Sequence, residues 1–211
     1  MARDYKDYVG PAHRWEAAGR ERFRQLLAEG MTEQTRVLDV GCGSLRLGRL
    51  LIPFLAARSY CGLEPGREWL EAGLEHEVVA TWGDALLEHK QPRFDHNGDF
   101  DLQVFGDTFD LIVAFAVFIH CGPEQLRIFL TNAAGVLRPG GRVLIDVNLD
   151  DQTYQKGRHR KYAHASNQKV RYAEADFLAP VRDTGWQHEE LDRQQDPRKG
   201  KARTLFRLTR G

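Results

Sequence analysis

The sequence is poor in the residues that build disulfide scaffolds and zinc sites. Only three of its 211 residues are cysteines (Cys42, Cys61 and Cys121), and no two of them form a CxxC pair. An odd cysteine count without paired spacing excludes a disulfide framework and a structural zinc site. The histidines between residues 159 and 188 show no spacing typical of metal ligands, so we predict no metal. A reducing, cytoplasmic location is the expectation.

The sequence also lacks an excess of either charge and any long apolar run. Thirty Lys and Arg residues balance thirty Asp and Glu residues. Proteins that hold nucleic acid usually show a basic excess, so we expect no nucleic-acid partner. The longest apolar run, Leu111 to Ile119, is too short to cross a bilayer. The start, MARDYKDYVG, has no apolar core of a signal peptide, and we expect no membrane association.

What the sequence does contain is an alternation of strand and helix patterns. We expect strands at 36–40, 59–63, 92–96, 109–116 and 142–147, with helices between them at 45–55, 67–75, 77–89 and 123–137. This alternation predicts an α/β fold with a doubly wound, mostly parallel sheet. A helix at 173–183 and strands near 186–191 and 203–208 would complete it, the last two as an antiparallel hairpin.

The ends of this pattern suggest a domain organisation. Residues 1–30 are expected to form an N-terminal helical cap or lid. Residues 31–211 are expected to form one catalytic domain, in which the polar stretch 148–172 is a substrate-side insert.

The segment VLDVGCGS, residues 37–44, is the most informative one. A strand runs into glycines and then a helix, and glycine allows positive φ and close approach of a ligand to the main chain. Such a crevice could hold a dinucleotide or S-adenosylmethionine. The dinucleotide fingerprint GxGxxG fails, because Arg46 takes its third glycine position. Asp39 could hold the ammonium of a bound amino acid, whereas it would repel a pyrophosphate.

Two further acids fit a nucleoside ligand. Glu64 ends the second strand, 23 residues after Gly41, at the spacing of acids that accept hydrogen bonds from ribose hydroxyls. Asp99 could accept a hydrogen bond from an adenine amine, with Phe100 supplying a backbone N–H and a ring wall. Asp101 is the alternative for the role of Asp99.

These motifs, in the order VLDVGCGSLRLG, YCGLEP, GDFD, FDLIVAFAVFIHC and VLRPGGRVLIDV, resemble class I S-adenosylmethionine-dependent methyltransferases over residues 36–147, and GCGSLR resembles a bacterial subgroup. The resemblance implies a seven-stranded Rossmann-like sheet with a reversed last hairpin. It implies cofactor contacts at Asp39, Gly41, Gly43, Glu64 and Asp99, and the set that we assign to the cofactor also includes Cys42, Pro65, Phe100 and Phe115. Leu45 departs from the commoner GxGxG pattern.

The reacting centre should lie beyond the fourth strand, in Phe115–Cys121. His120 is the candidate general base, or else a histidine that only supports the loop. Asp146 could orient His120 or contact substrate, or be a solvated strand-end acid, and Asn148 has the same ambiguity. Substrate-contact candidates before and after the sheet are Tyr5, Tyr8, Asn148 and Tyr154.

The expected function is methyl transfer from S-adenosylmethionine to a small molecule, most simply at a hydroxyl if His120 is the base. Alternatives are N-methylation, a repurposed fold that catalyses another biosynthetic reaction such as a cyclisation, and a non-enzymatic binding module. After the fourth strand the sequence lacks the Asn/Asp-Pro-Pro-aromatic motif of enzymes that methylate nucleobases and glutamine. A monomer or homodimer is expected.

Overall fold

The computed structural model describes residues 5–150, 170–196 and 201–211. The chain divides into two compact units, Met1–Asn97 and Gly98–Gly211, which are taken in turn.

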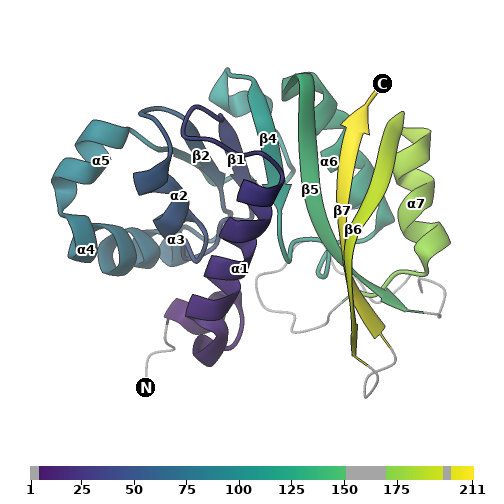
Figure 1. The fold of residues 1–211 in the computed structure, drawn as a ribbon, viewed down its shortest axis with the longest axis horizontal. Helices are drawn as coiled ribbons and strands as arrows, with labels where there is room; N and C mark the ends of the chain where they lie inside the picture. Colours follow the sequence, from purple (N-terminus) through teal and green to yellow (C-terminus); the bar gives the residue numbers. More distant parts are fainter. Residues whose placement is uncertain (1–4, 151–169, 197–200) are drawn as a thin grey trace. The chain divides into compact units, whose positions relative to one another are not determined.

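The first unit contains three parallel strands and the helices before and between them in the sequence. Its elements are η1 (Tyr5–Val9), η2 (Ala12–Arg14), α1 (Trp15–Ala28), β1 (Val37–Val40), α2 (Gly48–Phe54), β2 (Tyr60–Leu63), α3 (Arg67–Gly73), the π-helix η3 (Leu74–Val79), α4 (Ala80–Trp82), α5 (Asp84–Lys90) and β3 (Arg93–Asp95). Figure 1 labels β1, β2 and the helices α1 to α5. Every residue of β1 and β2 is buried, as expected for strands covered on both faces.

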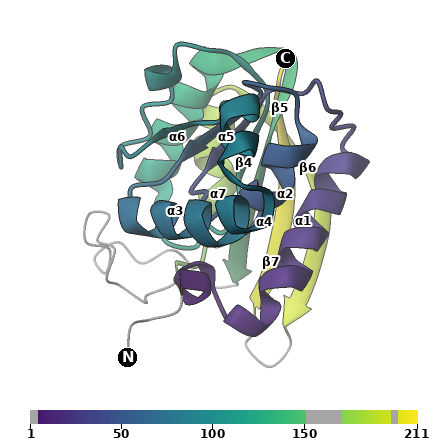
Figure 2. The ribbon, with the colours of Figure 1, turned by 90° about the vertical axis from the view of Figure 1, so that its left-hand side faces the viewer.

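The helices of this unit differ from the sequence prediction in one informative way. The predicted helices 67–75 and 77–89 are joined by the π-helix η3, so that α3, η3 and α4 run on as one helical stretch (Figure 2). The break comes later, at Gly83, which has φ 74°. A left-handed residue ends a helix, and glycine adopts that conformation at little cost.

The second unit contains the remaining strands and two long helices (Figure 1). Its elements are η4 (Gln103–Phe105), β4 (Phe109–Ala114), α6 (Pro123–Val136), β5 (Leu137–Asp150), α7 (Glu174–Asp183), β6 (Trp186–Asp196) and β7 (Lys201–Arg210). β4 and β5 are parallel, whereas β7 lies antiparallel between β5 and β6. α6 and α7 pack together behind these strands in Figure 1.

β5 begins earlier than the sequence pattern predicts. We expected Pro139–Gly141 to connect the helix to a strand at 142, but β5 already begins at Leu137. Its pairing shifts, because Phe109 pairs with Leu137 while Leu111 pairs with Arg142. The extra residues of β5 are taken up as an irregularity, of the kind that β-bulges make in a strand.

Aromatic side chains fill the interior of the second unit. Phe100 stacks on Phe118 with ring centroids 5.8 Å apart, and Phe129 packs edge-on against Phe100. On the other side of the unit Phe177 packs against Phe206 at 4.9 Å. This packing holds the segments on either side of β4 against α6.

The predicted fold class is confirmed. The strand order β3-β2-β1-β4-β5-β7-β6 is that of a seven-stranded, mostly parallel sheet with an antiparallel C-terminal pair. The cysteines are all reduced and buried. Within the three described ranges, no helix has the length and apolar character needed to cross a bilayer.

Candidate cofactor site and reacting loop

The glycine loop leaves β1 in a succession of left-handed turns. Gly41 has φ 71°, Gly43 has φ 56° and Leu45 has φ 62°. The Gly41 N–H donates to the carbonyl of Leu63 at 2.7 Å, which ties the loop to the end of β2. Leu45 therefore adopts the left-handed conformation that glycine would adopt at that place, at a cost of about 1–2 kcal/mol. Its side chain is fully buried, which offsets that strain.

Asp39 lies within β1 as a buried acid. Its Oδ2 accepts a hydrogen bond from the Tyr60 hydroxyl at 3.0 Å. Burial raises the pKa of Asp39 to about 6, although the Tyr60 hydrogen bond and the positive charge of Arg22 act to lower it. A buried carboxylate in this state gains free energy from a cation, so a ligand ammonium is a fitting partner.

Glu64 is a buried acid at the end of β2. Its Oε2 accepts the Gly43 N–H at 2.9 Å, and its Oε1 accepts the Gly66 N–H at 2.8 Å. These two bonds fix the carboxylate beside the glycine loop.

Two other residues of the predicted set lie at the same strand ends. Cys42 is buried in the glycine loop, and burial raises the pKa of its thiol well above the usual range. The thiol is therefore neutral at physiological pH and is not a nucleophile. Pro65 is half-buried directly after Glu64.

The N-terminal segment contacts the glycine loop. The carbonyl of Tyr5 accepts a hydrogen bond from the Ser44 hydroxyl at 2.8 Å. Val9 lies so close to Gly43 that a Cβ added to that glycine would come 2.2 Å from Val9 Cγ1. Tyr5 itself packs edge-on against Trp15 at 5.8 Å. The side chain of Tyr8 lies outside what the structure describes.

The two candidate adenine acids, Asp99 and Asp101, lie in the second unit on either side of Phe100 in the sequence. Both acids are exposed, and Asp101 Oδ1 accepts the Gln103 N–H at 3.0 Å. Phe100 has φ 62°, and Asn132 Nδ2 donates to its carbonyl at 2.7 Å. Its ring belongs to the aromatic interior.

The loop after β4 carries His120 on an exposed turn. The His120 N–H donates to the carbonyl of Val117 at 2.9 Å. Phe115 is buried and Ala116 has φ 62°, an unusual conformation for a residue with a side chain. Burial raises the pKa of Cys121 to about 12, so this neighbouring thiol stays protonated at neutral pH. His120 is the exposed imidazole of this loop, and its role as a general base stays a prediction.

Asp146 is buried, so the interpretation of it as a solvated strand-end acid is wrong. It accepts the backbone N–H of Ala116, and Arg203 on β7 donates to it from Nε at 2.9 Å and also from Nη2. The cause is topological, because the pairing of β5 with β7 places Asn148 opposite Arg203 and Asp146 within its reach. Asp146 thus holds the strained turn at the start of the loop of residues 115–121, which we call the reacting loop.

A residue that sequence reasoning missed holds the other end of this loop. Tyr172 is buried, and its hydroxyl donates to the carbonyl of Cys121. Its N–H donates to the carbonyl of Asn148 at 3.0 Å, so Asn148 is anchored through its main chain. Tyr154, and most of the predicted insert 148–172, lie outside the described residues.

Other missed residues are Tyr60, Arg203 and Glu77. Tyr60 lies on the strand next to Asp39 but pairs with Val37, two residues before that acid, so finding it needed the register of β1 and β2. Arg203 needed the strand order, because it is far from Asp146 in sequence. Glu77 sits on a π-helix, which periodicity does not reveal. Among the described residues, no group of three or more His, Cys, Asp or Glu side chains could hold a metal ion.

Three solved structures share this fold. A magnesium protoporphyrin IX methyltransferase from Synechocystis, solved with bound S-adenosylmethionine, is 15% identical, with a TM-score of 0.67 over 98% of this chain and 89% of its own. An S-adenosylmethionine-dependent methyltransferase from Clostridium acetobutylicum is 14% identical, with a TM-score of 0.63 over 99% and 93%. The glycopeptide N-methyltransferase MtfA is also 14% identical, with a TM-score of 0.63 over 95% and 97%.

The family assignment comes from the sequence itself. Residues 38–143 match the family model described as a methyltransferase domain. That range holds the glycine loop, Asp39, Glu64 and the reacting loop with His120. The chain belongs to the class I S-adenosylmethionine-dependent methyltransferases, as the glycine loop and its acids predicted.

Proposed function

We propose that this enzyme transfers the methyl group of S-adenosylmethionine to a hydroxyl of a small molecule. The single observation that carries the cofactor part is the pair of buried acids at adjacent strand ends, Asp39 and Glu64, on either side of the glycine loop. Both acids are buried, and Glu64 is fixed by main-chain donors of the loop itself. Such pre-organised acids suit a ligand that carries both an ammonium and hydroxyls.

The proposed contacts divide the cofactor into three parts. Asp39 binds the ammonium of the methionine moiety, close to the main chain of Gly41, Cys42 and Gly43. Glu64, followed by Pro65, accepts hydrogen bonds from the ribose hydroxyls. For the adenine amine, the prediction from the sequence stays Asp99 as acceptor, with Phe100 and Phe115 as apolar neighbours. The cofactor supplies an activated methyl group, because its sulfur carries a positive charge.

The proposed chemistry is an in-line displacement. The acceptor oxygen attacks the methyl carbon, the bond from that carbon to sulfur breaks, and the electron pair returns to sulfur to give S-adenosylhomocysteine. The proton of the hydroxyl passes to the imidazole of His120. The exposed position of His120 lets it exchange that proton with water after turnover.

We give Asp146 a positioning role in place of a catalytic one. Arg203 already neutralises it, and its contact with the Ala116 N–H holds the strained start of the loop that carries His120. Tyr5, Tyr8, Asn148 and Tyr154 remain the proposed contacts of the acceptor.

The acceptor atom can be tested with paired small molecules that differ only in carrying a hydroxyl or an amine at one position. Release of S-adenosylhomocysteine would be followed, with the product identified by mass spectrometry. We expect methylation of the hydroxyl member, reduced about 10²–10⁴-fold in the variant His120→Ala. Methylation confined to the amine members would show N-methylation instead.

A further inference from the structure

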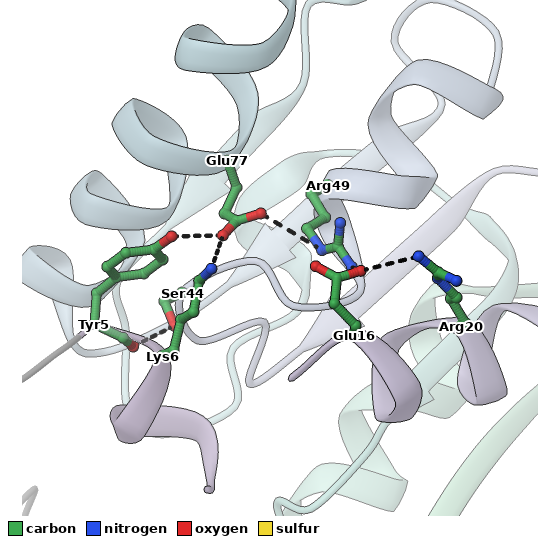
Figure 3. Close-up of polar contacts among 7 residues, drawn as sticks. All are labelled: Tyr5, Lys6, Glu16, Arg20, Ser44, Arg49 and Glu77. Atoms are coloured by element: carbon green, nitrogen blue, oxygen red, sulfur yellow. Dashed lines mark hydrogen bonds and ion pairs between the residues drawn. The ribbon is translucent and has the colours of Figure 1, made fainter. Parts of the chain in front are cut away.

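A carboxylate of the first unit, Glu77, has contacts that the proposed chemistry does not use (Figure 3). It lies on the π-helix η3, and its side chain is only 10% exposed. The π-turn changes the direction in which the following side chains point around the helix axis. Such turns occur often at functional sites.

Glu77 joins the N-terminal segment to the helix that follows the glycine loop. Its Oε1 accepts the Tyr5 hydroxyl at 2.5 Å and lies 3.2 Å from Lys6 Nζ. Its Oε2 lies 3.6 Å from Nε of Arg49, on α2. Figure 3 shows the carboxylate reaching down between Tyr5 and Arg49. One largely covered carboxylate therefore has partners from two elements, η1 and α2.

The segment that Glu77 holds is the one that lies against the glycine loop. We call residues 5–14 the strap. Its Tyr5 carbonyl accepts the Ser44 hydroxyl at 2.8 Å, and its Val9 fills the space next to Gly43. Tyr5 thus makes both contacts at once, one through its side chain to Glu77 and one through its main chain to Ser44.

The neighbouring ion pairs are weaker candidates for this role. Arg49 also contacts Glu16 at 2.8 Å, and Glu16 contacts Arg20 at 3.6 Å, but Glu16 is more than half exposed. Exposed pairs of this kind add little, because water screens them. The contact of Tyr5 with Glu77 is shielded and charge-assisted, and such bonds are stronger.

We propose that Glu77 is a positioning residue that latches the strap onto the glycine loop and so retains the bound cofactor. The inference rests on the proposed function, because it requires S-adenosylmethionine at that loop. With the latch intact, the strap must open before the cofactor leaves. Breaking the latch therefore raises the rate of cofactor dissociation.

The test is the dissociation rate of S-adenosylhomocysteine from the full chain, measured by displacement with excess S-adenosylmethionine. Glu77→Ala should raise this rate by about tenfold, and Tyr5→Phe by about threefold to tenfold, from the loss of one charge-assisted hydrogen bond. Glu77→Gln keeps an acceptor for Tyr5 and should have a smaller effect than Glu77→Ala. The matched control is Glu75→Ala, an exposed acid on the same π-helix, which should leave the rate unchanged.

Two measurements distinguish a variant that fails to fold from one that only loses the contact between Tyr5 and Glu77. Tyr5→Phe removes a single hydroxyl and keeps the ring that packs on Trp15, so this variant should fold normally by circular dichroism. The double variant Tyr5→Phe/Glu77→Ala should release the ligand no faster than Glu77→Ala alone, because both changes break one interaction. General destabilisation would give additive effects instead.

The outcomes distinguish this inference from the proposed function. If the wild-type chain binds neither adenosyl ligand, the proposed function fails. If it binds them and both Glu77→Ala and Tyr5→Phe release the ligand at the wild-type rate or more slowly, the latch is refuted while the cofactor site stands.

Discussion

The hydroxyl of Tyr60 donates to the carboxylate of Asp39 at 3.0 Å, between two adjacent buried strands. This contact keeps a negative charge inside the first unit at a place where burial disfavours it. Burial raises the pKa of Asp39 to about 6, although the Tyr60 hydrogen bond acts to lower it. A buried acid with a raised pKa fits the proposed ammonium site, because a ligand cation would offset part of the cost of burying its charge.

The first prediction concerns the pH dependence of cofactor binding. Asp39 binds an ammonium only as a carboxylate, so the affinity for S-adenosylhomocysteine should fall as the pH drops through about 6. Below that value each unit of pH should lower the affinity by up to about tenfold. Titration calorimetry between pH 5 and pH 8 (conditions chosen about the Asp39 pKa) measures this. In Asp39→Asn the affinity should be low and show no transition near pH 6; an unchanged profile in that variant would exclude Asp39 as the titrating group.

The second prediction concerns stability without ligand. The folded-state pKa of Asp39 is raised from 3.8 to about 6, so its favourable contribution is present below the lower value and lost as the pH rises through the higher one. At neutral pH and above, the charged form costs up to about 3 kcal/mol. Asp39→Asn should therefore raise the free energy of unfolding at pH 8, with a gain that shrinks toward pH 4. Chemical denaturation at both pH values tests this, and an equal gain at both would contradict it.

The third prediction separates the two acids by ligand chemistry. Methylthioadenosine has the ribose and adenine of the cofactor but lacks its amino-acid part. Glu64→Ala should weaken binding of both methylthioadenosine and S-adenosylhomocysteine by about 1.5–3 kcal/mol, because charge-assisted bonds to the ribose are lost. Asp39→Asn should weaken only S-adenosylhomocysteine. The control is Glu68→Ala, an exposed acid on α3; a Glu64 effect confined to one ligand would remove its ribose role.

The fourth prediction concerns the reacting loop. His120→Ala should lower turnover by about 10²–10⁴-fold and leave cofactor affinity nearly unchanged, because the proposed role is proton transfer from the acceptor. Asp146→Asn should instead lower thermal stability, since it weakens the partner of Arg203 and of the Ala116 N–H. Turnover falling less than tenfold in His120→Ala would leave that histidine only a supporting role.

The sequence was informative wherever function depends on a strand end. β1, the glycine loop, Glu64 and β4 follow from short apolar runs and glycine, so their places could be predicted. Leu45 shows the limit of a motif, because it takes the left-handed conformation of the missing glycine with its side chain buried. Periodicity could not predict η3, since a π-turn has no distinct pattern of its own.

Contacts between distant segments were beyond sequence reasoning. Asp146 meets Arg203 only because β7 inserts antiparallel beside β5, and the pattern of either strand alone does not specify that register. Tyr172 likewise bonds to Cys121 from a segment that looks irregular in sequence. Glu77 and Tyr5 are 72 positions apart, and their contact depends on how the strap packs against the rest of the first unit.

The central claim, that S-adenosylmethionine binds at the glycine loop between Asp39 and Glu64, is tested most directly by calorimetric titration of the full chain. S-adenosylmethionine, S-adenosylhomocysteine and NAD would be titrated in parallel into wild-type protein and Glu64→Ala. The account predicts micromolar binding of the two adenosyl ligands, no binding of NAD, and weaker binding in Glu64→Ala. Absence of binding by both adenosyl ligands, or equal affinity in Glu64→Ala, would contradict it.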